Sequence, residues 1–315
     1  MQYRIGIDLG GTAIKAGVVD ENNEVVFSHS QPTGEGFEQV VADMAKAAET
    51  VAAMAGLKVS DFPCVGVGTP SCINPNTGRL VFSNNTNWRD MPLREELEKH
   101  LPVPVYIGND ANCAIIGEAV AGAAKGCQSV IMLTLGTGVG GGVILGGKLF
   151  VGGDGMGAEL GHAPVMHKGN MCTCGIPGCL EAYASVTALI QQAEEAMKAY
   201  PDSLLHARAA ENGGKLNGRI IFDCAHAKDS AALAVVDQYE EYLANGIGGL
   251  INIFRPEIFL IGGGLSAQGD YLLDPIREKV KKYVFAYDII GAPPVVKATL
   301  GNAAGTIGAA YLDRM

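Results

Sequence analysis

The chain has 315 residues, too many for one simple core, so that two domains are expected. Its net charge of −10 and the lack of any basic run make nucleic acid and anionic membranes poor partners for the surface as a whole. The N-terminal residues read as a strand rather than a signal peptide, and no apolar run reaches the length of a membrane span, which predicts a cytoplasmic protein.

The N-terminal part of the chain alternates between strands and helices. Its first three strands follow one another directly, and the next helix shows apolar residues at 3.6-residue spacing. The expected elements are strands over 3–8, 13–19 and 24–29, a helix over 36–55, a strand over 64–68, a helix over 93–101 and a strand over 103–107. This order predicts an α/β protein with a mixed sheet and helices packed against it.

The same arrangement of strand, glycine turn and strand begins again near residue 129. The expected elements there are strands over 129–135 and 139–145, helices over 180–199 and 230–254, a strand over 257–261, a helix over 271–283, a strand over 295–298 and a helix over 303–313. The repeat predicts two similar domains that face each other across a cleft.

The segment D-L-G-G-T at residues 8–12 places two consecutive glycines at the tip of the first predicted hairpin. Because glycine has no Cβ, backbone N–H groups at such a tip can approach a phosphate closely, and Thr12 adds a hydroxyl. Asp8, at the end of the strand, is placed to hold hydrated Mg²⁺. The alternative is an ordinary hairpin turn without a ligand. It is less favoured because Gly136-Thr137-Gly138 repeats the pattern of strand, glycine turn and strand. Neither turn matches a P-loop or opens a helix as a Rossmann turn does.

Two further segments follow predicted strands. Asp110 is either the N-cap of the next helix or a carboxylate that faces a cleft, where it can accept the proton of a reacting hydroxyl. The run Gly262–Gly264 is either a flat surface for a nucleotide base and ribose or a plain turn between strand and helix.

The segment from Glu159 to Glu181 is rich in metal-ligating side chains. Three thiolates and one imidazole make a full tetrahedral set for structural zinc, and the predicted ligands are His162, Cys172, Cys174 and Cys179. His167 is the competing fourth ligand. A purely structural zinc site would not need the flanking carboxylates of Glu159 and Glu181. Their presence predicts that zinc shapes the wall of a pocket for a polar substrate. The other cysteines are interpreted as small core residues of a reduced compartment.

The motifs occur together in one known family. The chain resembles bacterial ROK-family sugar kinases, and most closely their glucokinases. The matching segments are D-L-G-G-T-x-x-K at Asp8–Lys15, G-N-D-A-N at 108–112, G-T-G-V-G-G-G at 136–142, E-L-G-H at 159–162 and C-x-C-G-x-x-G-C-x-E at 172–181.

The resemblance implies the actin-like ATPase (ribonuclease H-like) fold, ATP with Mg²⁺ and a hexose as ligands, and a homodimer or homotetramer. It implies two domains: residues 1–117 with the C-terminal helix 302–315, and residues 118–301 with the zinc site. Asp110 would be the general base for the 6-hydroxyl of the sugar. The implied sugar contacts are Asn84, Asn109, Asp110, Glu159, His162 and Glu181. The implied nucleotide and metal contacts are Asp8, Gly10, Gly11, Thr12, Lys15, Thr137, Gly138 and Gly263.

Two departures from the family pattern lie on the sugar side. Pro70-Ser71 replaces the usual Pro-Gly, and the segment Asn84–Trp88 replaces the usual N-L-P-G-W. Its amides form either a sugar-binding lip or a polar turn, so the substrate is less defined than the reaction.

The leading expectation is phosphorylation of glucose at the 6-position. The close alternatives are N-acetylmannosamine, N-acetylglucosamine, fructose and mannose. A sugar-sensing transcriptional regulator is disfavoured by the acidic charge and by the position of Asp8 seven residues from the start, ahead of which such relatives carry a DNA-binding domain. A non-enzymatic actin-like ATPase leaves the cysteine cluster and its flanking acids without a role.

Overall fold

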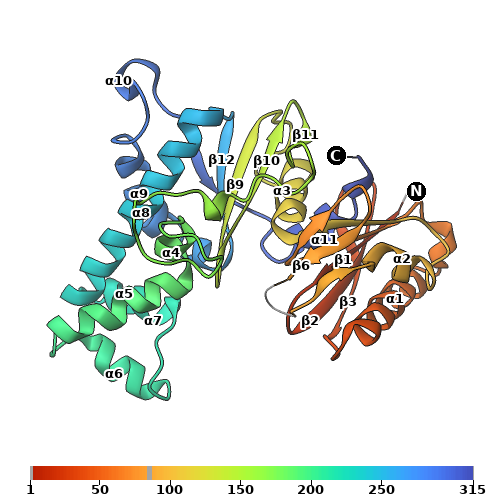
Figure 1. The fold of residues 1–315 in the computed structure, drawn as a ribbon, viewed down its shortest axis with the longest axis horizontal. Helices are drawn as coiled ribbons and strands as arrows, with labels where there is room; N and C mark the ends of the chain where they lie inside the picture. Colours follow the sequence, from red (N-terminus) through yellow and green to blue (C-terminus); the bar gives the residue numbers. More distant parts are fainter. Residues whose placement is uncertain (1–2, 84–86, 315) are drawn as a thin grey trace. The chain divides into compact units, whose positions relative to one another are not determined.

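A computed structural model describes residues 3–83 and 87–314 of the chain. The chain divides into two compact units (Figure 1). The first unit comprises Met1–Ile131, Gly142–Ala158 and Ala298–Met315, and the second comprises Met132–Gly141 and Glu159–Lys297. No helix in the described part of the chain is long and apolar enough to cross a membrane.

The first unit is built on a five-stranded sheet with the order β3-β2-β1-β4-β8. Its strands are β1 (Arg4–Leu9), β2 (Ala13–Val19), β3 (Val25–Pro32), β4 (Val65–Thr69) and β8 (Val105–Asn109). The first three strands form the expected antiparallel meander, whereas β4 is parallel to both β1 and β8. The carboxyl ends of β1, β4 and β8 therefore lie at one edge of the sheet.

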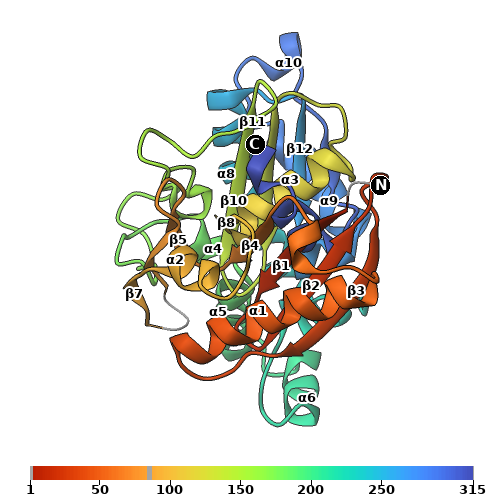
Figure 2. The same ribbon diagram turned by 90° about the vertical axis from the view of Figure 1, so that its right-hand side faces the viewer.

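The two faces of this sheet are covered by different helices. Ile5 and Ile7 share a core with the apolar stripe of α1 (Phe37–Met54), which lies along the strands in Figure 2. Gly6, between them, points to the other face, where a Cβ would lie 1.9 Å from the Thr306 carbonyl oxygen of α11 (Ala303–Ala309). Alternation of side chains along a strand explains why isoleucine and glycine face opposite ways. The second helix on this face is α3 (Asp110–Val120).

A small antiparallel sheet with the order β5-β6-β7 follows β4 and was not predicted from the sequence. Its strands are β5 (Cys72–Asn74), β6 (Arg79–Phe82) and β7 (Arg89–Met91). The 3₁₀ turn Val59–Asp61 precedes β4, and α2 (Leu93–Glu98) follows β7. Strands of three or four residues are too short to show a period-2 pattern.

A second sheet has the order β11-β10-β9-β12-β13. Its strands are β9 (Val130–Leu135), β10 (Val139–Leu145), β11 (Lys148–Leu149), β12 (Ile258–Gly262) and β13 (Val295–Lys297). In each sheet the strand that comes first in the chain, β1 or β9, is central. The next two strands in the chain lie on one side of it, and two later strands lie on the other side. The repeat expected from the sequence is therefore confirmed at the level of sheet topology.

In the second half of the chain, the longest helix has the bounds that the sequence predicts. The predicted bounds of α8 (Ser230–Phe254) are confirmed. The helix expected over 180–199 is broken at Ser185, whose backbone is extended and whose hydroxyl accepts the Ala188 N–H at 3.0 Å to cap a new helix. The remaining helical elements are Leu160–His162, α4 (Glu181–Ala184), α5 (Val186–Ala199), α6 (Leu204–Glu211), α7 (Gly218–His226), Gly264–Gln268, α9 (Asp270–Val280), α10 (Tyr287–Ile290) and Leu312–Arg314.

Candidate functional site

Predicted site residues gather at the carboxyl edge of the first sheet. Asp8 is in register with Gly68 of β4, and Thr69 of β4 is in register with Asn109 of β8. Burial raises the pKa of the Cys113 thiol well above its ordinary value, and the carboxylates of Asp110 and Asp8 raise it further. Both acids therefore lie near one buried sulfur atom. Asp8, Gly10–Thr12, Asn109 and Asp110 are referred to below as the strand-end cluster.

The capping residue of α3 is Asn109 rather than Asp110. The Asn109 Oδ1 accepts the N–H groups of Ala111 at 2.9 Å and Asn112 at 3.2 Å, and its Nδ2 donates to the Ser71 carbonyl at 3.3 Å. The acceptor of Asn109 is thus engaged, and at most one N–H of its amide is left for a ligand. Asp110 is the first residue of the helix, and its Oδ1 accepts the Ala111 N–H at 2.8 Å.

The first glycine turn closes the β1–β2 hairpin through the Gly10 N–H, which donates to the Ala13 carbonyl at 2.9 Å. Gly11 and Thr12 are exposed at the tip. The Lys15 ammonium lies 4.0 Å from the Asp8 carboxylate. Burial raises the pKa of Asp8, and Lys15 partly offsets this effect. A half-buried carboxylate beside an exposed glycine turn suits a hydrated cation and a phosphate.

The second glycine turn follows β9 and is packed against the Gly262–Gly264 run. Gly263 has a φ of +79°, and a Cβ there would lie 2.4 Å from the backbone nitrogen of Leu135, the last residue of β9. Only glycine fits this contact without displacing the backbone. The structure thus brings Gly263 next to the turn that contains Thr137 and Gly138.

His162, Cys172, Cys174 and Cys179 form a cluster in which one ligand atom from each lies within 4.8 Å of the others. The Cys174 and Cys179 sulfur atoms are 3.7 Å apart, and the Cys172 sulfur is 3.7 Å from Nδ1 of His162. Tetrahedral zinc with Zn–S bonds of about 2.3 Å requires sulfur atoms about 3.8 Å apart, so the donor set and its spacing fit the ion. His167 does not belong to this cluster.

The Glu181 carboxylate joins the cysteine cluster to the second glycine turn. Its Oε2 accepts the Val139 N–H at 3.0 Å, directly after Gly138. Its Oε1 accepts the hydroxyl of Thr173 at 3.1 Å and the thiol of Cys172 at 3.3 Å. The segment Glu159–Glu181 together with Gly136–Val139 is referred to below as the metal-loop cluster.

Glu159 begins this segment and precedes the 3₁₀ turn Leu160–His162. The side chain keeps contact with solvent, yet partial burial raises the pKa of its carboxyl. Nearby His162 lowers this pKa, and the Glu181 carboxylate raises it. These effects place His162 and Glu181 within electrostatic reach of Glu159.

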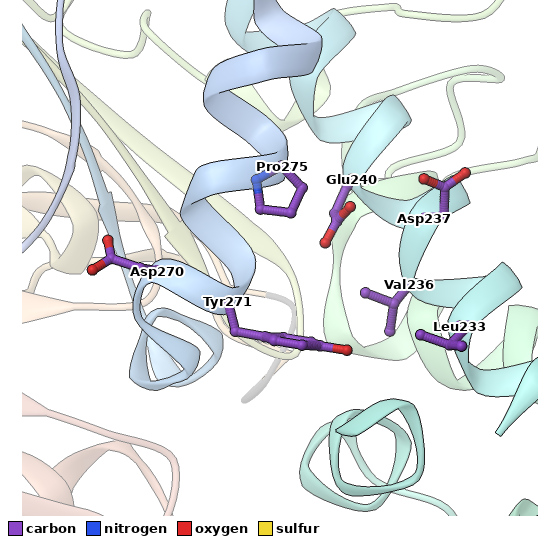
Figure 3. A pocket seen from close by; sticks show the side chains of 7 residues that line it. All are labelled: Leu233, Val236, Asp237, Glu240, Asp270, Tyr271 and Pro275. Carbon is purple, nitrogen blue, oxygen red and sulfur yellow. The ribbon is translucent and has the colours of Figure 1, made fainter. Parts of the chain in front are cut away.

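A groove of about 360 Å³ between α8 and α9 contains none of the predicted site residues (Figure 3). Its wall includes the carboxylates of Asp237 and Glu240, both of which are paired with Lys279 at 2.7 and 2.8 Å. Asp270 is paired with Arg277 at 3.0 Å. These three acids are thus paired with cations of the same compact unit.

Several residues support the site through contacts that the sequence analysis did not predict. Ser71 orients Asn109 through its carbonyl, and the hydroxyls of Thr33 and Thr187 donate to carbonyls of the two glycine turns. They lie outside the glycine motifs, and no spacing rule links them. The predicted sugar contact Asn84 lies outside the described residues.

The comparisons with known proteins agree with this architecture. A family model described as the ROK family matches residues 4–315. The glucokinase of Thermotoga maritima is 41% identical over 314 residues, which cover 98% of this chain and 96% of the relative. The glucokinase of Streptomyces coelicolor is 38% identical over 320 residues, which cover 100% of this chain and 98% of the relative.

A crystal structure of a ROK family glucokinase from Streptomyces griseus in complex with glucose and AMPPNP superimposes with a TM-score of 0.85. It is 34% identical to this chain, and the match covers 98% of both chains. The fold is therefore the actin-like ATPase fold of ROK kinases, as expected from the motifs. The chain belongs to the ROK family.

Proposed function

We propose that the protein transfers the γ-phosphoryl group of ATP to the 6-hydroxyl of glucose, which yields glucose 6-phosphate. The observation that carries this proposal is the 41% identity to a glucokinase over 98% of the chain. A second support is the TM-score of 0.85 to a glucokinase structure in complex with glucose and AMPPNP. Motifs for both the sugar and the nucleotide are present in family order.

Asp110 is the proposed general base. Because the Asn109 cap fixes the first turn of α3, the Asp110 carboxylate is held at a helix N-terminus. There it orients the 6-hydroxyl and accepts its proton as the phosphoryl group moves.

The proposed phosphate contacts are backbone N–H groups of the two glycine turns. Such groups neutralise the charge that spreads over the phosphoryl oxygens without any reorganisation at the moment of transfer. Asp8 and Lys15 would accompany them, Asp8 through waters on a Mg²⁺ ion that, when bound, supplies positive charge to the phosphates. The nucleotide set is Asp8, Gly10, Gly11, Thr12, Lys15, Thr137, Gly138 and Gly263.

The proposed hexose contacts are polar groups that can satisfy ring hydroxyls. Carboxylates are acceptors for hydroxyl protons, and the second ring nitrogen of His162 is oriented by the engagement of Nδ1 toward Cys172. Asn109 contributes at most its remaining amide N–H. The full set is Asn84, Asn109, Asp110, Glu159, His162 and Glu181.

Zinc is the proposed resident metal of His162, Cys172, Cys174 and Cys179. Its role is structural, because a Cys₃His set leaves no coordination position for a substrate. Bound there, it would hold the loop that carries His162 and Glu181. The proposed domain boundaries remain those expected from the family, namely 1–117 with 302–315, and 118–301. A homodimer or homotetramer is the proposed assembly, which light scattering of the purified protein would test.

The test is a comparison of kcat/KM for glucose, mannose, fructose, N-acetylglucosamine and N-acetylmannosamine with saturating ATP, followed through ADP release. We expect glucose to exceed each other sugar by at least about tenfold, within the range that pocket contacts supply. A higher kcat/KM for an acetamido sugar would overturn the choice of glucose. Absence of turnover with every sugar would overturn the assignment as a hexose kinase.

A further inference from the structure

The two glycine turns share a feature outside their motifs. In the first turn, the Thr33 hydroxyl, just after β3, donates to the Gly10 carbonyl at 2.8 Å. The Thr33 N–H also donates to the Thr12 carbonyl at 3.1 Å. One residue from a neighbouring segment thus binds a carbonyl at each end of the turn.

The second turn has the same kind of support from the start of α5. The Thr187 hydroxyl donates to the Thr137 carbonyl at 2.8 Å, and the Val186 N–H donates to the Gly136 carbonyl at 2.9 Å. As in the first turn, a threonine hydroxyl and a backbone N–H bind two carbonyls of the turn. The threonines come from unrelated elements, a strand end in one case and a helix start in the other.

These bonds fix the direction of the adjoining N–H groups. A trans peptide points its C=O and N–H in opposite directions. A Gly10 carbonyl held toward Thr33 therefore turns the Gly11 N–H away from Thr33. In the second turn, the bonds at Gly136 and Thr137 turn two successive N–H groups, those of Thr137 and Gly138, away from α5. Successive outward N–H groups form an anion-binding concavity.

The first hairpin also departs from a regular two-residue turn. A regular turn would pair Gly10 and Ala13 through two hydrogen bonds. Among the described residues we find the bond from Gly10 N–H to Ala13 C=O, at 2.9 Å, but the Gly10 carbonyl accepts the Thr33 hydroxyl in place of the Ala13 N–H. The turn is thereby held open by a side chain from outside the hairpin.

We propose that Thr33 and Thr187 are positioning residues for the nucleotide phosphates. By holding turn carbonyls away from the tip, each keeps backbone N–H groups directed at the phosphates and prevents a peptide flip that would direct a carbonyl oxygen at them. This inference rests on the proposed binding of ATP at the two turns. Neither threonine touches ATP in this account, and each acts through the peptide that it holds.

The test uses the full-length protein and the variants Thr33→Val and Thr187→Val, which keep the side-chain shape and remove the hydroxyl. Each variant should raise KM for ATP by about three- to tenfold, the effect of losing one neutral hydrogen bond, while KM for glucose stays within about twofold of wild type. Thr33→Ser and Thr187→Ser, which retain the donor, should restore KM for ATP. Affinity for the nonhydrolysable analogue AMPPNP, measured by calorimetry, should follow the same order.

A matched control is Thr50→Val in α1, whose hydroxyl also donates to a backbone carbonyl, that of Lys46, at 2.8 Å. It should leave both KM values unchanged. The inference fails if Thr33→Val and Thr187→Val leave KM for ATP at the wild-type value, if Thr50→Val raises it equally, or if serine does not restore it. Wild-type protein that binds AMPPNP but phosphorylates no sugar would contradict the proposed function instead, and the calorimetric comparison of the variants would still decide the role of the threonines.

Discussion

The strand-end cluster and the metal-loop cluster are positioned by different forces. In the first, Asp8, Asn109 and Asp110 emerge where parallel strands of one hydrogen-bonded sheet end, and its register sets their spacing. In the second, His162 lies in a loop whose longest regular element is the 3₁₀ turn Leu160–His162, and Glu181 is the first residue of α4. Isolated backbone hydrogen bonds, such as that from the Val165 N–H to the Gly178 carbonyl at 2.8 Å, and contacts among the metal-ligating side chains hold this loop. The proposed general base thus lies at the end of a sheet strand, and the proposed sugar contacts Glu159, His162 and Glu181 lie in the region that a metal can organise.

This difference has a consequence for the second glycine turn. Glu181 bonds both to the cysteine loop and to the Val139 N–H at 3.0 Å, so that disorder in the loop would reach the turn. The first turn is held by Thr33 and by its own strands. The two regions should therefore respond differently to the loss of zinc and to the loss of a carboxylate.

The largest effect is expected for Asp110→Asn. Loss of the proposed general base should reduce kcat by at least about a hundredfold, with little change in zinc content. Steady-state kinetics and metal analysis of the purified variant provide the measurement. Asp270→Asn is the matched control, because Asp270 is also the first residue of a helix, α9. An unchanged kcat in folded Asp110→Asn protein would remove Asp110 from the mechanism.

The next largest effect is expected for Cys174→Ala. With one of four ligands lost, zinc content should fall to near zero and KM for glucose should rise by about ten- to a hundredfold, as for other disturbances around a metal site. The melting temperature should fall by roughly 5–10 °C, equivalent to about 2–3 kcal/mol. Cys127→Ala, outside the cluster, should retain both zinc and affinity. Full zinc occupancy in Cys174→Ala would refute the ligand set.

The smallest effect concerns the stability of the strand-end cluster. Burial holds the pKa of Asp8 above its ordinary value, so its ionisation costs folded-state stability as the pH rises through that raised pKa. Asp8→Asn removes this cost and should raise the melting temperature by about 2 °C at pH 7.5, while ATP binding weakens. The gain should vanish below about pH 4, where the acid is protonated in both states.

The pKa of the Asp20 carboxyl is shifted in the opposite direction to that of Asp8. Backbone hydrogen bonds from Glu24 and Asn22 help to lower it. Asp20→Asn should leave the melting temperature at pH 7.5 unchanged or lower it. The measurement is the melting temperature of Asp8→Asn minus that of the wild type, at pH 7.5 and at pH 4. A smaller difference at pH 7.5 than at pH 4 would show that the Asp8 charge stabilises the fold.

The sequence predicts the long and repeated elements well. The bounds of α8 follow from a sustained apolar period, and the shared order of the two sheets follows from the repeated glycine hairpin. The short strands β5–β7 and the helices α6 and α7 were missed. The break at Ser185 is a local cap within a continuous helical pattern, so that composition alone does not reveal it.

The candidate site likewise has features that the sequence predicts and features that it does not. Motifs predict which residues gather at the sheet edge and around the cysteines, because glycines, thiols and carboxylates carry recognisable chemistry. They do not predict that Asn109 rather than Asp110 caps α3, or that Thr33 and Thr187 hold the glycine turns. These contacts depend on where unrelated segments meet in space, which no local pattern encodes.

Hydrogen exchange of the zinc-loaded protein and of the same protein after removal of zinc by a chelator tests the contrast between the two clusters most directly. Amides of residues 159–181 and that of Val139 should exchange at least about tenfold faster without zinc, because the proposed metal would stabilise the folded loop. Amides of residues 10–13 and 109–112 should exchange at unchanged rates. Unchanged protection across 159–181, or an equal loss of protection in both clusters, would show that zinc does not organise the metal-loop cluster selectively.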